Sequence, residues 1–246
     1  MIDLFVQVML GLNKFLFNNL GLTIIVVGLL SRAVFYPFFA NSIRYSKAMR
    51  DLKPRLDALR KKHKGDMQKL AAEQSRLFKE AGVNPAASVL GCFSMIIQIG
   101  IFFLLFQSIN RVITSDINTN FLLWDLAKPD AYRVEGLPVA IPGVLVILTA
   151  VLTFFQSKMI APPAETKKPQ KRGQSGEKPD ISDAISASTG QLAYIIPVVI
   201  LVFGTTFAAG LALYWFVSTA FGIIQQYNIT GLGGLEPWLK RLRPAK

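Results

Sequence analysis

The sequence of 246 residues contains only one cysteine, Cys92, and one histidine, His63. A single cysteine excludes a disulfide within the chain, and these two residues cannot make a Cys/His metal cluster, so we expect neither a metal site nor a cofactor. A hydrolase that works inside a membrane needs a nucleophile and a base at membrane depth. Because His63 lies in a highly charged segment, we do not expect an enzyme.

Acidic residues are absent from five apolar stretches that hydropathy predicts as membrane spans. These stretches are residues 19–40, 88–110, 137–160, 192–208 and 211–225. The absence of Asp and Glu argues against the carboxylate proton relays that pumps use. No internal repeat relates the five stretches, although such repeats are common in transporters. We therefore predict an all-α, polytopic membrane protein with five transmembrane helices.

Basic residues are also scarce in these stretches, which contain only Arg32 and, at the end of the third, Lys158. A charged side chain at the bilayer centre costs about 2.5–3.5 kcal/mol on insertion scales. Along a helix, Arg32 lies about 10–12 Å from the end of its stretch, whereas an extended arginine side chain spans about 6–7 Å. The guanidinium therefore either reaches the lipid headgroups with the help of local bilayer thinning or lies in a water-lined recess. Arg32 is the first candidate functional residue.

Positive charge is concentrated on one side of the predicted spans. Residues 41–87 contain 12 Lys/Arg against 5 Asp/Glu, residues 161–191 contain 5 Lys/Arg, and residues 226–246 contain 4. The other side contains only Lys14, Arg111, Lys128 and Arg133. By the positive-inside rule, both basic loops and the C-terminal tail are cytoplasmic, and the N-terminus lies outside.

The largest basic segment, residues 41–87, predicts a cytoplasmic helical hairpin. Residues 55–62 and 67–81 have the pattern of charged helices, and Gly82 is a typical helix stop. Pro54 would start or kink the first arm. The alternative is a charged linker that is merely solvated, and either form would attract anionic lipid headgroups.

The remaining connections differ in kind. Residues 1–18 place polar side chains on one helical face, which predicts an amphipathic interfacial helix. Residues 111–136 form an extracytoplasmic loop, and the proline-rich residues 161–191 are predicted to be a disordered cytoplasmic loop. Only Ala209 and Gly210 join the last two spans, so we expect a short helical hairpin that either thins the bilayer around it or is shielded from lipid by other helices.

Six strings along the chain resemble one known family. They are SRAVFYPF (31–38), LKPRLDALRKKH (52–63), VNP with GCFSMIIQIGIFFLLF (83–106), WDLAKPD (124–130), FFQSKM (154–159) and AAGLALYWFVSTAFGIIQQ (208–226). In this order they resemble the YidC membrane protein insertase family over about the whole chain. The chain is most similar to the minimal five-span form, which is related to the mitochondrial and chloroplast insertases.

The resemblance implies an insertase and folding chaperone of the bacterial plasma membrane. Such a protein receives nascent membrane proteins in a hydrophilic groove that is open to cytoplasm and lipid, alone or with the Sec translocon. Arg32 matches the arginine at the centre of that groove by its place before Tyr36 and Pro37. Gln156 and Trp215 match polar and aromatic positions that face the same groove. The implied partners include the translocon and the ribosome, and DNA is not among them.

Gln98 and Gln225 complete the candidate groove with Arg32, Gln156 and Trp215. Some of these residues have a simpler interpretation. Gln98 could serve only to join two helices through a hydrogen bond, worth about 0.6 kcal/mol on average, and Trp215 could be an ordinary packing residue. Gln225 lies near the cytoplasmic boundary of the membrane, where placing a polar amide costs little free energy. The alternative function is a transporter of small solutes or anions that uses Arg32 as its binding site.

Overall fold

Helices make up most of the computed structural model, which describes residues 2–63, 66–83, 87–112, 117–136, 140–161 and 193–242. The labelled helices are α1 (Ile2–Phe15), α2 (Leu20–Val34), α3 (Tyr36–Lys62), α4 (Met67–Glu80), α5 (Ala87–Val112), α6 (Val144–Ile160), α8 (Ala209–Thr230) and α9 (Leu235–Leu242). A further helix spans Ala193–Phe203. The predicted disordered loop, 161–191, lies outside the described residues except for Ala161.

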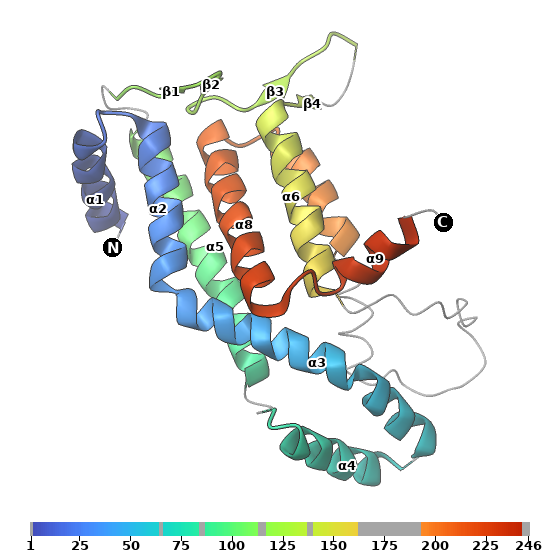
Figure 1. Ribbon diagram of the computed structural model, residues 1–246. Coiled ribbons are helices and arrows are strands. Elements are labelled where there is room, and N and C mark those ends of the chain that lie inside the picture. The colour runs from blue at the N-terminus through green and yellow to red at the C-terminus, as the bar shows by residue number, and fades with distance from the viewer. Residues whose placement is uncertain are drawn as a thin grey trace.

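The helices form a bundle with α2, α8 and α6 side by side, α5 behind them and α3 crossing beneath (Figure 1). Tyr214 of α8 is fully enclosed and packs with Ile24 of α2 and Leu105 of α5. Large apolar side chains also point outward, among them Val144, Ile147, Leu148 and Val151 of α6 and Ile195, Val198, Val199 and Val202 of the following helix. Apolar residues therefore occupy both the interior and the outer surface of the bundle.

The first predicted span is not one straight helix. Helix α2 ends at Val34, and α3 begins at Tyr36 with a bend of 65° between the two. Pro37 occupies the first turn of α3. Proline has no N–H and its ring disfavours helical geometry in the preceding residues, so the earlier helix ends here and a new one begins. The bend turns α3 away from the bundle toward the basic hairpin (Figure 1).

The predicted helical hairpin is present, with one correction. Its first arm is the continuous helix α3, which passes through Pro54, so the expected helix start at residue 55 is wrong. The second arm, α4, begins at the predicted residue and ends within one residue of it. Gly82 ends the arm with a φ of +64°, and the Val83 N–H donates to the Phe78 carbonyl at 2.8 Å. This is the glycine stop that the sequence predicted.

A small buried cluster of leucines joins the two arms of the hairpin. Leu52 and Leu56 of α3 pack against Leu77 of α4. The arms are therefore held together by apolar contacts and are not merely a solvated linker.

The segment 117–136 contains strands, which the all-α prediction did not include. β1 (Asn120–Phe121) pairs with β2 (Trp124–Asp125), and β3 (Ala131–Tyr132) pairs with β4 (Ile141–Pro142), both antiparallel. Because residues 141–142 belong to β4, α6 begins at Val144 and not at 137 as expected. The carbonyls of Leu126 and Lys128 accept hydrogen bonds from the N–H groups of Gly210 and Ala209 at 3.0 and 2.8 Å. The segment thus holds the first turn of α8.

The last two predicted spans also have different bounds. The fourth ends at Phe203 because the chain turns at Gly204, where an added Cβ would lie 2.7 Å from Val146 Cγ1. Residues 209–210, expected as the linker, are the first residues of α8, which continues five residues beyond Gln225 to Thr230. Residues 204–208 therefore make the connection. The predicted tail contains a helix that the sequence did not indicate, α9.

Among the described helices, none taken singly combines the length and hydropathy needed to cross a bilayer. The bent pair Leu20–Val34 and Tyr36–Leu59 satisfies both requirements together. Three apolar helical segments are shorter: Ile96–Val112 within α5, Val144–Ile160 and Ala193–Phe203.

Candidate functional site

Arg32 lies in the last turn of α2 and points into the bundle, where only 9% of it is exposed. Its Nε donates a hydrogen bond to Ser218 Oγ of α8 at 2.9 Å. The guanidinium carbon lies 4.4 Å from the centre of the Phe39 ring of α3. Among the described residues, no carboxylate forms an ion pair with Arg32. A hydroxyl and an aromatic face therefore stabilise this cation, and its charge is not neutralised.

One face of α8 supplies the polar surroundings of Arg32. Tyr214, Ser218, Gly222 and Gln225 are spaced by four, four and three residues, so they lie on one side of the helix, and all four are buried. Tyr214, Ser218 and Gly222 were not among the predicted site residues. Their helical spacing was the available signal, but tyrosine, serine and glycine are also ordinary packing residues in membrane helices.

Gln156 of α6 and Arg32 of α2 meet at Gly222. A Cβ added to Gly222 would lie 3.3 Å from Arg32 Nη2 and would overlap Gln156 Nε2. Glycine leaves this space free, because a side chain here would push the amide or the guanidinium aside. The structure thus brings together two of the five predicted site residues.

Gln98 and Gln225 lie at the edges of this cluster. Gln98 Nε2 of α5 donates to the Tyr214 hydroxyl at 3.1 Å, which is the interhelical hydrogen bond weighed as its simpler role. Gln225 Nε2 donates a long hydrogen bond, 3.5 Å, to the Tyr36 carbonyl at the α2/α3 bend. The Oε1 atom of Gln225 and the Oγ1 atom of Thr153 on α6 are buried without a hydrogen-bond partner among the described residues. Such oxygens are natural acceptors for a polar guest.

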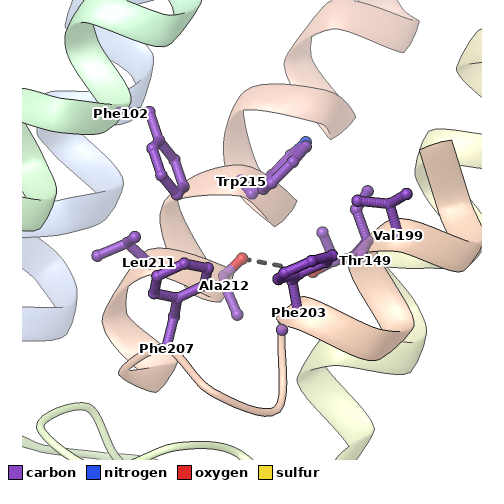
Figure 2. Close-up of a pocket in the computed structure, with 10 residues that line it drawn as sticks. Phe102, Thr149, Val199, Phe203, Phe207, Leu211, Ala212 and Trp215 are labelled. Atoms are coloured by element: carbon purple, nitrogen blue, oxygen red, sulfur yellow. Dashed lines mark hydrogen bonds between the residues drawn. The ribbon is translucent and has the colours of Figure 1, made fainter.

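Trp215 lies in different surroundings. Its ring packs edge-on against Phe102 at 5.7 Å between centroids, and it lines an apolar cavity of about 50 Å³ with Phe203, Phe207 and Leu211 (Figure 2). Arg32 does not line this cavity. The structure therefore places Trp215 in an apolar wall, apart from the polar cluster around Arg32.

A second buried cation, Lys158, lies in the last turn of α6, two residues after Gln156. Lys158 Nζ donates to the Tyr194 hydroxyl at 2.5 Å and lies 3.7 Å from the centre of the Tyr194 ring. Nearby, Arg50 of α3 donates to the Met159 carbonyl at 3.0 Å, and the Gly234 N–H donates to the same oxygen at 3.1 Å. The last two hydrogen bonds satisfy one carbonyl at the end of α6 and join this helix to α3 and to the C-terminal segment.

Together these features define a class of protein. Helices that expose apolar side chains outward, and that enclose a cation without an acidic partner among the described residues, are typical of helical membrane proteins.

The chain belongs to the 60Kd inner membrane protein family, whose family model matches residues 12–232. It is similar to "Membrane protein insertase YidC 2" of Bacillus anthracis, with 31% identity over 87% of this chain and 73% of the relative. It is also similar to "Membrane protein insertase YidC 1" of Halalkalibacterium halodurans, with 34% identity over 87% of this chain and 71% of the relative. "Membrane protein insertase MisCA" of Bacillus subtilis is 32% identical over the same shares. The predicted family is confirmed, and it is a family of bacterial inner membrane proteins named as insertases, not as enzymes.

Proposed function

We propose that this protein is a membrane protein insertase and folding chaperone. It receives nascent membrane proteins in a hydrated groove within the membrane and releases them into the bilayer, alone or with the Sec translocon. The observation that carries the proposal is the buried guanidinium of Arg32, which has a hydroxyl and an aromatic ring as partners but no carboxylate among the described residues. The names of the related proteins support the same function.

The groove lowers the barrier for a polar segment of the client. Crossing hydrocarbon is costly for each unpaired polar group. Arg32 and the amides of Gln156 and Gln225 offer donors and acceptors partway across, so part of the path is already polar. An acidic segment gains most, because the positive charge at Arg32 is not neutralised by the protein and is attracted to the incoming carboxylates. No covalent step is needed.

The apolar segment of the client leaves along a different surface. Phe102 and Trp215 face the apolar cavity between α5, α8 and the helix Ala193–Phe203, next to outward-facing residues such as Val199 (Figure 2). A hydrophobic helix that packs here exchanges these contacts for lipid at little cost. Polar and apolar parts of one client are thus accommodated on neighbouring sides of α8.

The proposed arrangement in the membrane has five spans, with the N-terminus outside and the C-terminus in the cytoplasm. The charge asymmetry of the loops supports this orientation. Helix α1 lies at the outer interface, and the basic hairpin of α3 and α4 lies on the cytoplasmic side. There it meets anionic lipids, the translocon or the ribosome through its many Lys and Arg residues.

The alternative function, a transporter of small solutes or anions, receives no support from the named relatives, which are insertases. Purified protein in liposomes separates the two functions. An insertase integrates clients without solute flux across the membrane, whereas a transporter gives flux without any client.

Site-specific crosslinking to a stalled nascent client tests the proposed groove. A photoreactive residue is placed at Arg32, Gln156 or Trp215, and as a control at Val151, which faces outward on α6. We expect positions 32 and 156 to capture the polar segment of the client and position 215 to capture its apolar segment. Capture no stronger at these three positions than at 151 would contradict the proposal.

A further inference from the structure

The most exposed large apolar side chains of the described chain lie on two neighbouring turns. Phe15, Phe17, Leu122 and Leu123 are 87%, 89%, 82% and 92% exposed, and no other large apolar residue among those described exceeds 68%. We call these four residues the outer apolar tip. Exposed apolar clusters of this kind mark surfaces that bind a partner or a membrane.

Backbone contacts fix the two turns beside each other at the start of α2. The turn after α1 leads directly into Asn19, which bridges to Asn118, and the Leu20 N–H donates to the Asn118 carbonyl at 3.3 Å. The β1–β2 turn is held by Phe121, whose Cβ would lie 2.7 Å from a Cβ added to Gly21. Both turns therefore lie at the same end of the bundle (Figure 1).

The backbone of the tip adopts a conformation that is uncommon for residues with a side chain. Only three non-glycine residues among those described have a positive φ: Phe17 at 57°, Asn18 at 51° and Leu122 at 53°. A bulky residue rarely adopts this region, and such strain persists where the surrounding structure enforces it, often at functional positions. Two of the three residues belong to the tip, and the third lies next to it.

We propose that the outer apolar tip inserts into the outer leaflet of the membrane and anchors the start of α2 to the lipid. The tip continues an exposed apolar stripe on α1, formed by Leu4, Val8 and Phe15 at helical spacing. Lys14 is exposed beside Phe15, which places a positive charge where anionic headgroups lie. A lipid bilayer therefore complements this surface, because its hydrocarbon matches the apolar side chains and its anionic headgroups match Lys14.

The anchor acts at the helix that carries Arg32. Asn13 of α1 accepts a hydrogen bond from the Thr23 hydroxyl of α2 at 3.0 Å, so the tip, α1 and the first turn of α2 are joined. Fixing the start of α2 in the outer leaflet fixes the depth of Arg32, which lies three turns further along the same helix. This inference does not require the chain to be an insertase.

Spin-label accessibility tests the anchor in the full chain. Cys92 is replaced by serine, and Phe17→Cys, Leu123→Cys and the control Glu135→Cys each carry one nitroxide in vesicles of phosphatidylethanolamine and phosphatidylglycerol. Glu135 is an exposed polar residue of the same outer segment. Collisions with oxygen, which concentrates in lipid, are compared with collisions with a water-soluble nickel chelate. Because the tip side chains are exposed, their replacement removes few contacts.

We expect the ratio of oxygen to nickel collisions to be several-fold higher at positions 17 and 123 than at 135. An equal ratio at all three positions would place the tip in water and overturn the proposal. Exclusion of both reagents at 17 and 123 would also overturn it, because that result means that a protein, such as a second copy of the chain, covers the tip.

Discussion

Arg32 is stabilised without being neutralised. A buried charge is usually paired with an opposite charge, and such a pair interacts weakly with any third charge. Here Ser218 contributes one hydrogen bond and Phe39 one aromatic face, so the positive charge remains available to a ligand. The buried charge of Arg32 therefore lowers the stability of the fold, and the same charge can bind a client in the proposed function.

Replacing Arg32 tests the role of its charge. We expect Arg32→Ala to reduce insertion of clients with acidic outer tails about tenfold, which corresponds to about 1.4 kcal/mol, and to affect strongly hydrophobic clients least. Arg32→Lys should be milder, because a positive charge and N–H donors remain. Insertion into vesicles, measured by protease protection of the client tail, gives the values. Equal insertion of acidic-tailed clients by the alanine variant and the native protein would refute the role of Arg32.

Gly222 tests whether the space between Arg32 and Gln156 matters. In Gly222→Ala the new methyl group displaces Gln156, and we expect reduced client insertion although alanine favours the helix by up to about 1 kcal/mol. Gly28→Ala is the matched control, since its Cβ would make ordinary contacts at 3.4 Å with Val217 and 3.5 Å with Tyr214. Client insertion and the melting temperature are measured for both. A loss of insertion that only parallels a loss of stability in both variants would argue against a specific role.

Residue chemistry made part of the site predictable. A lone arginine in an apolar stretch is conspicuous in any membrane sequence, and Gln156 was found through the resemblance to a family. Gly222 was missed because its role is the absence of a side chain at a contact between three helices, which no local pattern reveals. Trp215 was placed with Arg32 in the prediction, but its ring faces the apolar cavity. Neighbouring residues on a helix differ by about 100° in direction, so Trp215 points away from the face of α8 that carries Tyr214 and Ser218.

At the scale of elements, the outer segment 117–136 determines where two helices begin. Asp130 is buried, and its Oδ2 accepts hydrogen bonds from the N–H groups of Leu145 and Val146 at 2.8 and 3.1 Å, in the first turn of α6. Its Oδ1 accepts from Trp124 Nε1 at 3.1 Å. A carboxylate in this place satisfies free N–H groups and complements the helix dipole. One side chain thus joins the loop to α6.

Removing this cap should destabilise the fold. We expect Asp130→Ala to cost about 1–3 kcal/mol, because two helix N–H groups and the Trp124 indole lose their acceptor. Asp130→Asn should cost less, since asparagine also caps helices. Thermal unfolding in detergent gives the order of stability. Asp3→Asn is the control, because Asp3 is 80% exposed and its ion pair with Arg111 lies on the surface. An alanine variant as stable as this control would contradict the capping role.

The long elements were predictable from sequence, and their ends were not. Apolar runs predicted where α2, α5, α6 and α8 lie, but not the break after Val34 or the continuous course of α3 from Tyr36 to Lys62. The ends depended on contacts remote in sequence: α6 starts late because Ile141 and Pro142 pair with Tyr132 and Ala131. The strands have only two residues each, which is too short to show the alternation of polar and apolar residues that predicts a strand.

At the scale of the molecule, the bend at Phe35 connects the bundle to the hairpin. The same helix α3 carries Phe39 at the Arg32 site, Arg50 at the end of α6, and Leu52 and Leu56 in the hairpin. The hairpin is therefore connected through one helix to the Arg32 site and to the end of α6. The hydropathy of the chain predicted a polar hairpin but not this continuity.

Deleting residues 51–82 tests the hairpin while keeping Arg50 and its hydrogen bond to Met159. We expect the shortened protein to integrate into the membrane but to lose client insertion, because the segment that meets the incoming chain is gone. Integration is followed by protease protection, and insertion by the assay used for Arg32. A short Gly/Ser connection replaces the deleted residues so that the ends are not strained. Undiminished insertion would show that the hairpin plays no active part.

The hydrogen bonds from Gly210 to Leu126 and from Ala209 to Lys128 have a consequence for synthesis. The two acceptors are translated about 80 residues before their donors, which at roughly 5–20 residues per second is an interval of about 4–16 s. In the proposed topology, the segment 117–136 reaches the outer side of the membrane before the start of α8 has been made. The N-terminus of α8 therefore forms its hydrogen bonds with a segment that was synthesised well before it.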